Sequence, residues 1–404
     1  MAAYPKNWEN VTCCDWREDE NRIWLCLENK NAVCEIDKKN RKVRIVGSFP
    51  HNGLGEKNLS LSIEKNGDYI VFCPFMANDI AILRISTGEL DFINFTCFLS
   101  ENKRAYAGTE KFYRMVSYEN YILFLGIKYP AIMRLDLTTK KIDLFESWLE
   151  KVEKHKCKDA VFFTDGYAKK GNELYLPIGR CGGFLKVNMD TMAFDYMELD
   201  FTVRGILGMT QKENFIWFTE YDAEAKEFFQ WNLDDGEMKR IGLPSRDAFY
   251  APLYYNGSLM FFQNYRRKSY RYELKSGGWK DITDVMPGAA YSSDKKERGK
   301  EVAYFSSKGI FYRWNPQNNL VRFDEFKIED ESFLENAWID YRGKRKRHEI
   351  KEGRLNLRDY LDEISSFYTY VSGEKENIYK IKDMEKKEIY NGEQIWKLVE
   401  MWER

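Results

Sequence analysis

The chain has 404 residues, of which 44% are hydrophobic and 31% charged, a composition typical of a globular protein and not of a disordered or fibrous one. Its 63 lysines and arginines nearly balance its 64 aspartates and glutamates, so it lacks the net positive charge that nonspecific binding to nucleic acids or anionic membranes requires. We therefore expect neither a nucleic acid nor a membrane as a partner.

A two-part apolar motif recurs seven times along the chain. Each copy has a short run rich in Ile, Val, Tyr, Phe and Trp, a polar turn, and a second such run that ends at a polar residue. The first copy joins Arg22–Cys26 to Val33–Asp37. The seven polar ends fall at residues 37, 86, 136, 188, 232, 273 and 315. Their spacing averages about 46 residues, which matches a four-stranded β-propeller blade.

These runs have the length and composition of strands. They are four to seven residues long and rich in β-branched and aromatic residues. Turns such as Ser86-Thr87-Gly88 and Asp234-Asp235-Gly236 supply the glycines that hairpins need. The sequence therefore predicts an all-β protein, a seven-bladed β-propeller over residues 1–328.

A helix is predicted between the third and fourth copies, at residues 147–155. Ser147 and Glu150 have the spacing of a capping box, and Trp148 and Val152 lie on one stripe. The stripe either seals the edge of the blade beneath it or contacts another protein. The sequence does not separate these two alternatives.

The repeat stops after residue 328, and we expect residues 329–404 to form a short C-terminal extension. Asp340–His348 is a basic run that we interpret as a solvated hinge, because acidic residues follow it closely. Two capped amphipathic patterns, at residues 356–368 and 391–402, predict two helices packed on the propeller. The extension either closes the last blade or docks another protein.

One predicted blade resembles a known repeat. The segment Asn214–Glu220, continuing to Trp231–Gly236 and Ile241–Pro244, resembles the blades of streptogramin (virginiamycin B) lyase-like propellers. The resemblance implies a seven-bladed propeller and, in that family, a metal-assisted ring-opening lyase reaction that uses histidines and a carboxylate at the propeller centre. It extends loosely to one further blade, at residues 22–50.

The histidines do not support that activity. The chain has only His51, His155 and His348, and none matches the catalytic histidines that the resemblance implies. His51 follows Pro50 at a connection between blades, and no acidic partner for it can be recognised in the sequence, which favours a passive role. We therefore carry over the fold and not the activity.

Metal and cofactor motifs are missing from the sequence. Eight cysteines lie in the first half of the chain, and the adjacent pair Cys13-Cys14 has no second Cys or His pair at zinc spacing. No phosphate-binding glycine loop or dinucleotide fingerprint occurs. We expect no metal and no cofactor and, because no export signal is visible, reduced thiols in the cytoplasm.

Basic residues predict a ligand site on one face of the propeller, where the blade-to-blade connections and the loops between second and third strands emerge. Lys128, Arg180, Arg204 and Arg266 fall in these segments. A ring of one sign of charge concentrates anions, and arginine suits carboxylate, sulfate or phosphate. The alternative is that these residues are solvated surface charge, as is common in loops.

The sequence carries no constellation of catalytic residues. We therefore interpret the protein as a non-catalytic β-propeller that binds a protein partner or a small anionic ligand, the latter in its central funnel. The alternative is a lyase or carbohydrate-active enzyme that uses the same funnel, because the carboxylates are too numerous for a catalytic pair to be assigned from sequence.

Overall fold

The computed structural model describes residues 4, 7–95, 110–152, 162–179, 182–199, 205–222, 224–263, 268–286 and 294–352. The chain divides into two compact units. The larger comprises residues 10–52 and 57–327, and the smaller comprises residues 1–9, 53–56 and 328–404. Within the described ranges, no helix combines the length and the apolar composition needed to cross a membrane.

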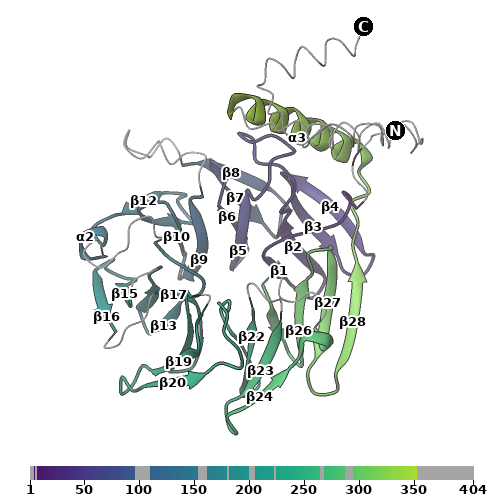
Figure 1. The fold of residues 1–404 in the computed structure, drawn as a ribbon. Helices are drawn as coiled ribbons and strands as arrows, with labels where there is room; N and C mark the ends of the chain where they lie inside the picture. The colour runs from purple at the N-terminus through teal and green to yellow at the C-terminus, as the bar shows by residue number, and fades with distance from the viewer. Residues whose placement is uncertain are drawn as a thin grey trace, which may run out of the picture. The chain divides into compact units, whose positions relative to one another are not determined.

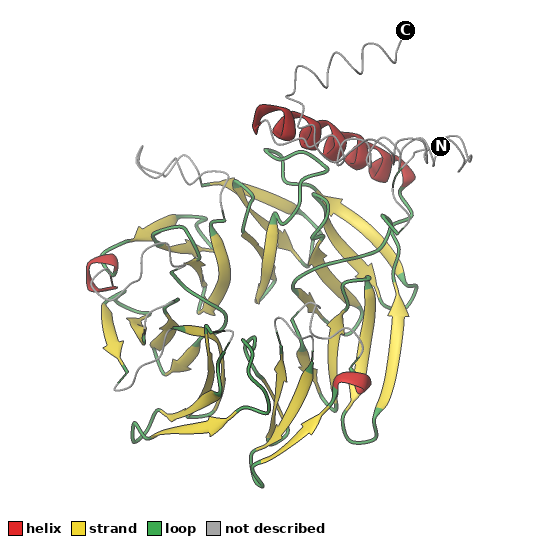
Figure 2. Ribbon diagram, viewed as in Figure 1, coloured by secondary structure: helices red, strands yellow, loops and turns green. Residues whose placement is uncertain are grey.

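The larger unit is a seven-bladed β-propeller, as the repeat predicts. It has seven four-stranded antiparallel sheets arranged in a ring, each made of four consecutive strands (Figures 1 and 2). The first four blades comprise β1 (Trp16–Glu18), β2 (Arg22–Cys26), β3 (Val33–Asp37), β4 (Lys42–Gly47); β5 (Ser60–Asn66), β6 (Tyr69–Pro74), β7 (Asp79–Arg84), β8 (Leu90–Asn94); β9 (Phe112–Tyr118), β10 (Tyr121–Gly126), β11 (Ile132–Asp136), β12 (Ile142–Phe145); β13 (Ala168–Lys170), β14 (Glu173–Pro177), β15 (Gly183–Asn188) and β16 (Phe194–Glu198). The last three comprise β17 (Ile206–Lys212), β18 (Phe215–Glu220), β19 (Glu227–Asn232), β20 (Met238–Gly242); β21 (Leu253–Tyr255), β22 (Ser258–Phe262), β23 (Ser269–Glu273), β24 (Gly278–Asp281); and β25 (Lys296–Arg298), β26 (Glu301–Phe305), β27 (Ile310–Asn315), β28 (Leu320–Glu325).

In five of the seven blades an Asp or Asn at the end of the third strand bonds to the turn that leads to the fourth. Oδ1 of Asp37 accepts hydrogen bonds from the backbone N–H groups of Lys39 and Asn40. Oδ1 of Asp136 likewise accepts hydrogen bonds from the backbone N–H groups of Thr138 and Thr139. An Asx turn of this kind explains why Asp or Asn recurs at that position. In the second blade β7 ends at Arg84, two residues before the predicted end, and Asp68 accepts the hydrogen bond from the backbone N–H of Ser86 in the turn.

The first and last blades meet without sharing a strand. The indole of Trp16 in β1 is fully buried and packs edge-on against Phe311 of β27, with ring centroids 5.2 Å apart. The backbone N–H of Asp294, just before β25, donates to the carbonyl of Cys14 over 2.7 Å. Side-chain packing and backbone contacts near the axis therefore close the ring.

The predicted helix after the third blade is present as α2 (Leu149–Val152), and its continuation to residue 155 lies outside the described residues. Trp148 and Val152 are buried in the apolar cluster between the third and fourth blades. Of the two alternatives for this stripe, the packing therefore supports the one in which it seals the blade edge. A short 3-10 helix, η2 (Thr283–Val285), follows β24.

The smaller unit contains α3 (Glu331–Glu352), which corrects one prediction. The basic run Asp340–His348, interpreted as a solvated hinge, is helical. Lysine, arginine and glutamate are good helix formers, and Asp330 accepts a hydrogen bond from the N–H of Phe333 at the start of the helix. The two predicted helices beyond residue 355 lie outside the described residues, so the packing of the extension stays a prediction.

Candidate functional site

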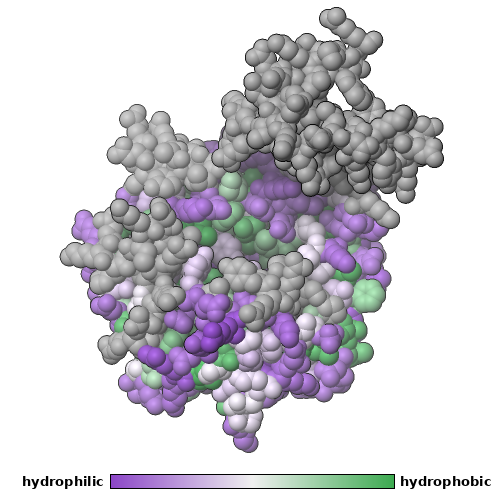
Figure 3. All heavy atoms as spheres, in the orientation of Figure 1, coloured by the Kyte–Doolittle hydropathy of each residue, from purple (hydrophilic) through white to green (hydrophobic). Residues whose placement is uncertain are grey.

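A cavity of about 410 Å³ lies on the propeller axis. Its walls are the first strands of all seven blades, the residues just before them, and Phe262 at the end of β22. First strands are innermost in the sheets, so a few side chains from each blade meet at the centre (Figure 1). The cavity lies at the end of the axis where the chain enters each blade. On the face shown in Figure 3, the described surface is mostly hydrophilic with small apolar patches.

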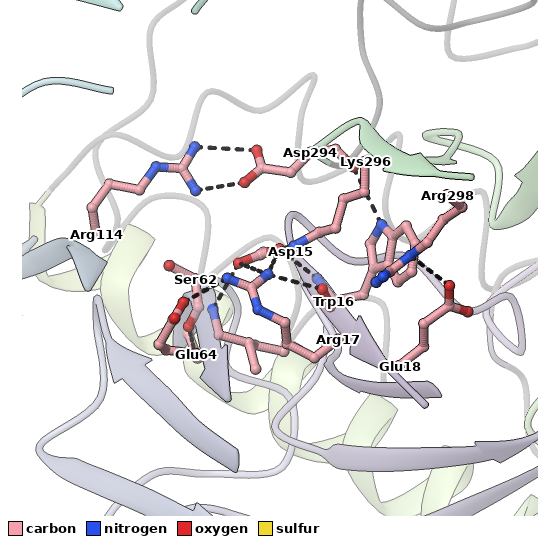
Figure 4. A network of polar contacts seen from close by, with 12 residues as sticks. Asp15, Trp16, Arg17, Glu18, Ser62, Glu64, Arg114, Asp294, Lys296 and Arg298 are labelled. Atoms are coloured by element: carbon pink, nitrogen blue, oxygen red, sulfur yellow. Dashed lines mark hydrogen bonds and ion pairs between the residues drawn. The ribbon is translucent and has the colours of Figure 1, made fainter. Parts of the chain in front are cut away.

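Charged side chains of both signs gather in this cavity. The described lining contains four acids and four bases, so the formal charge of the cavity is balanced. They are Asp15, Arg17, Glu64, Arg114, Asp165, Asp294, Lys295 and Lys296. Seven of the eight belong to two ion-pair networks, several of whose members are shown in Figure 4.

Arg114 of β9 is the centre of one network. Its Nε lies 2.6 Å from Oδ1 of Asp165. Its two terminal nitrogens lie 2.6 and 3.1 Å from the carboxylate oxygens of Asp294 (Figure 4). These bonds join the third, fourth and seventh blades. Burial opposes the charge of Arg114, but the two carboxylates outweigh it and raise its pKa.

Asp15 is the centre of the other network. Its carboxylate is 1% exposed and lies 2.6 Å from Nζ of Lys296 and 3.0 Å from Nη1 of Arg17. It also accepts a hydrogen bond of 2.8 Å from the backbone N–H of Ile63. Arg17 in turn lies 2.7 Å from Glu64, so this network joins the first, second and seventh blades (Figure 4).

Two of these carboxyl groups hold their protons more tightly than usual. Burial raises the pKa of Glu64, although the pairing with Arg17 opposes the shift. Burial likewise raises the pKa of Asp294, and the neighbouring charge of Arg114 opposes it. At both carboxyl groups the effect of burial on the pKa therefore outweighs that of the paired arginine.

Lys295 differs from the other charged residues of the cavity. Its Nζ makes no hydrogen bond or ion pair with any residue in the described part of the chain, and it lies 4.5 Å from the ring centroid of Phe262. Burial lowers the pKa of Lys295 to about 8. Tyr113, Tyr167 and Tyr250 also line the cavity, which gives it aromatic walls.

The four basic residues predicted from loops are not the ones that line this cavity in the described structure. Arg180, Arg204 and Arg266 lie outside the described residues, so their convergence stays a prediction. Lys128 follows β10, is half exposed and forms an ion pair with Glu110. It is not among the residues that line the axial cavity.

The sequence did contain a signal for the cavity residues. Three of these residues lie five positions before the second strand of their blade: Arg17, Glu64 and Lys296. Three others lie seven positions before it: Asp15, Arg114 and Asp294. Residues two apart lie on the same face of a strand. Charged residues at these two positions therefore mark the side of the first strand that faces the axis.

His51 has an acidic partner that sequence reasoning missed. Its Nδ1 lies 2.9 Å from the carboxylate of Asp79, which is 1% exposed, while the imidazole is 58% exposed. Asn94 donates to the same carboxylate over 3.1 Å. This pair does not line the axial cavity.

The described residues contain neither a metal-binding cluster nor a disulfide. No three His, Cys, Asp or Glu side chains among them are placed to hold one metal ion. Five cysteines lie in the described ranges, and all have free thiols: Cys13, Cys14, Cys26, Cys34 and Cys73. Burial raises the pKa of Cys14, so this thiol at the cavity wall is a poor nucleophile.

Neither a family model nor a curated protein sequence matches the chain, but solved structures do. Virginiamycin B lyase from Staphylococcus aureus is 12% identical with a TM-score of 0.57, over 76% of this chain and 95% of the lyase. The computationally designed protein Ika8 is 9% identical with a TM-score of 0.51, over 78% and 87%. A chain of the mitotic checkpoint complex is 10% identical with a TM-score of 0.51, over 81% and 89%. The resemblance to lyase propellers is thus confirmed for the fold alone.

Proposed function

We propose that this protein is a non-catalytic binding propeller whose axial cavity holds a small anionic ligand. The observation that supports this most directly is Lys295, a cation that lines the cavity and has no ion-pair partner among the described residues. A ligand carboxylate, sulfate or phosphate supplies the missing partner. The interaction is strong because the cavity walls shield it from bulk water.

The other charges of the cavity act as a fixed frame. Asp15 and Arg114 each hold two partners, and these contacts are 2.6 to 3.1 Å long. Groups that are already paired need no rearrangement when a ligand enters, and they keep one geometry. The ligand's negative charge is therefore directed to Lys295.

The aromatic walls favour an organic anion over an inorganic one. The lining includes four aromatic residues, Tyr113, Tyr167, Tyr250 and Phe262. A volume of about 410 Å³ is in the range of small-molecule sites, and such sites combine apolar walls with a few placed polar groups. A ligand with a carbon body and one anionic group fits this combination.

A carbohydrate-active enzyme or lyase in the same cavity is the second candidate. The raised pKa of Glu64 favours it, because a general acid must be protonated near neutral pH. However, Oε2 of Glu64 is held 2.7 Å from Arg17, which stabilises the ionised form. No histidine is found among the described residues of the lining, so the lyase chemistry that the resemblance implies lacks support.

Thermal unfolding in the presence of small anions tests the proposal. We expect lactate, sulfate or phosphate to raise the Tm of the full-length protein, and the increase to disappear in Lys295→Met. Lys128→Met is the matched control, because Lys128 is half exposed and lies outside the cavity lining. Equal increases in both variants would show that anions do not bind at Lys295.

A further inference from the structure

Two adjacent lysines of the cavity have opposite surroundings. Nζ of Lys296 lies 2.6 Å from the carboxylate of Asp15 and forms an ion pair with it. Nζ of Lys295 lies over the ring of Phe262 and has no such partner among the described residues. A lysine reacts as a nucleophile only in its unprotonated form, which apolar surroundings favour. Burial makes the amine of Lys295 easier to deprotonate than an exposed lysine.

Arg114 prevents the nearby acids from cancelling this effect. Asp165 and Asp294 both line the cavity, and both are bound by the guanidinium of Arg114 at 2.6 Å. The positive charge of Arg114 partly offsets the attraction of these two carboxylates for the proton of Lys295. The pKa of Lys295 is lowered to about 8, mainly by burial, so an appreciable fraction of the amine is unprotonated near neutral pH.

We propose that the ligand of this cavity is a 2-oxo acid and that Lys295 binds it covalently as an imine. The inference rests on the proposed function, because it takes the ligand to be an anion at Lys295. The unprotonated Nζ adds to the carbonyl carbon and forms a carbon–nitrogen bond. The resulting carbinolamine loses water, whose oxygen is the former carbonyl oxygen and whose hydrogens come from Nζ. No oxidation or co-reactant is involved.

The charge of the cavity selects this class of carbonyl compound. When the imine is protonated, its nitrogen carries the positive charge that the ammonium carried before. In a 2-oxo acid the carboxylate is bonded directly to the carbonyl carbon, so it lies next to that charge and balances it. A simple aldehyde forms the same bond but leaves the cation in the cavity without a counter-ion.

Reductive trapping of the full-length protein tests the imine. The protein is incubated near pH 7.5 with glyoxylate, pyruvate or 2-oxobutyrate, reduced with sodium cyanoborohydride, and mapped by peptide mass spectrometry. We expect Lys295 to gain the mass of the ligand less one oxygen atom, at least tenfold faster than Lys296. Lys295→Arg keeps the charge and is expected to lose the label at this position only.

Lactate separates this inference from the proposed function, because it has the carboxylate of pyruvate but no carbonyl group. We expect lactate to slow the trapping of pyruvate by competition. If none of the three 2-oxo acids labels Lys295 faster than Lys296, the proposal that Lys295 forms an imine is wrong. In that case a lactate-induced rise in Tm that Lys295→Met abolishes would still support anion binding, and its absence would overturn both. The labelling is measured on the unaltered chain and does not depend on the folding of a variant.

Discussion

The carboxylate of Asp15 in the first blade lies 2.6 Å from Nζ of Lys296 in the last blade. In the described part of the chain each blade is built from four consecutive strands, and the N-terminal segment meets the segment after β28 in an isolated bridge between Asn10 and Lys327. Closure of the ring therefore depends on contacts such as this pair and the neighbouring pair of Glu18 and Arg298, also 2.6 Å apart. Because Asp15 and Lys296 also line the axial cavity, ring closure and the shape of the candidate site are coupled.

Replacing Asp15 by Asn should destabilise the propeller by about 3 kcal/mol, since removing one member of a buried pair leaves the other charge uncompensated. Chemical denaturation measures the free energy of unfolding. The control is Asp91→Asn, which breaks an exposed pair with Lys140 and should cost less than about 1 kcal/mol. Similar losses in the two variants would mean that the Asp15 network does not hold the first and last blades together.

The fold could be predicted because its most regular features are local. Strands such as Tyr121–Gly126 are buried almost throughout and are therefore apolar, and the Asx turns after the third strands repeat with the blades. The first strands were harder to recognise. β25, for example, consists of Lys296, Glu297 and Arg298, which have neither the composition nor the length of a typical strand.

The candidate site could not be assembled from sequence spacing. Arg114 and Asp294 are 180 residues apart, and only the ring closure brings them together. Four basic loop residues were predicted, whereas the described cavity is built from the innermost strands and the residues just before them. His51 and Asp79 were missed as a pair because His51 lies in the connection between the first two blades and Asp79 lies in β7, so they meet only in the folded chain.

Lys295→Met should stabilise the protein by about 1 kcal/mol, in the range found when a strained functional group is replaced. The variant removes a partly buried cation that has no ion-pair partner in the described structure and adds an apolar side chain next to Phe262. Thermal and chemical unfolding without ligand measure the gain. Lys296→Met should instead lower stability, because it leaves the carboxylate of Asp15 with one cation fewer.

The contribution of Lys295 to the stability of the unaltered protein should rise with pH between about 8 and 10.4. The pKa of Lys295 is about 8 in the folded protein, below the value of about 10.4 expected for an unfolded chain. In this window the unfolded state binds more protons than the folded state, so raising the pH favours folding. Other groups titrate in this range as well, so the measured quantity is the difference in free energy of unfolding between the unaltered protein and Lys295→Met. A difference that does not change with pH would contradict the lowered pKa.

Anion binding should weaken as the pH rises through 8. An anion pairs with the ammonium form of Lys295, whose pKa is about 8 in the empty cavity. Above this pH the affinity for lactate should fall by about tenfold per pH unit, and below it the affinity should level off. Calorimetric titrations from pH 6.5 to 9.5 measure the profile. Lys295→Arg should remove the dependence, because arginine stays charged throughout this range.

Gly166→Ala should destabilise the cavity wall by more than a typical glycine substitution does. Gly166 lies between Asp165 and Tyr167 with a φ of +87°, and a Cβ atom there would lie 2.1 Å from the carbonyl oxygen of Met209. Gly171 is the matched control in the same blade, since its φ is +62° but a Cβ atom would meet nothing within 4 Å. Both variants carry the backbone cost of positive φ, on the order of 1 kcal/mol. Unfolding measurements should therefore show a larger loss for Gly166→Ala, because the neighbouring first strand must move. Equal losses would show that the wall between the fourth and fifth blades yields without cost.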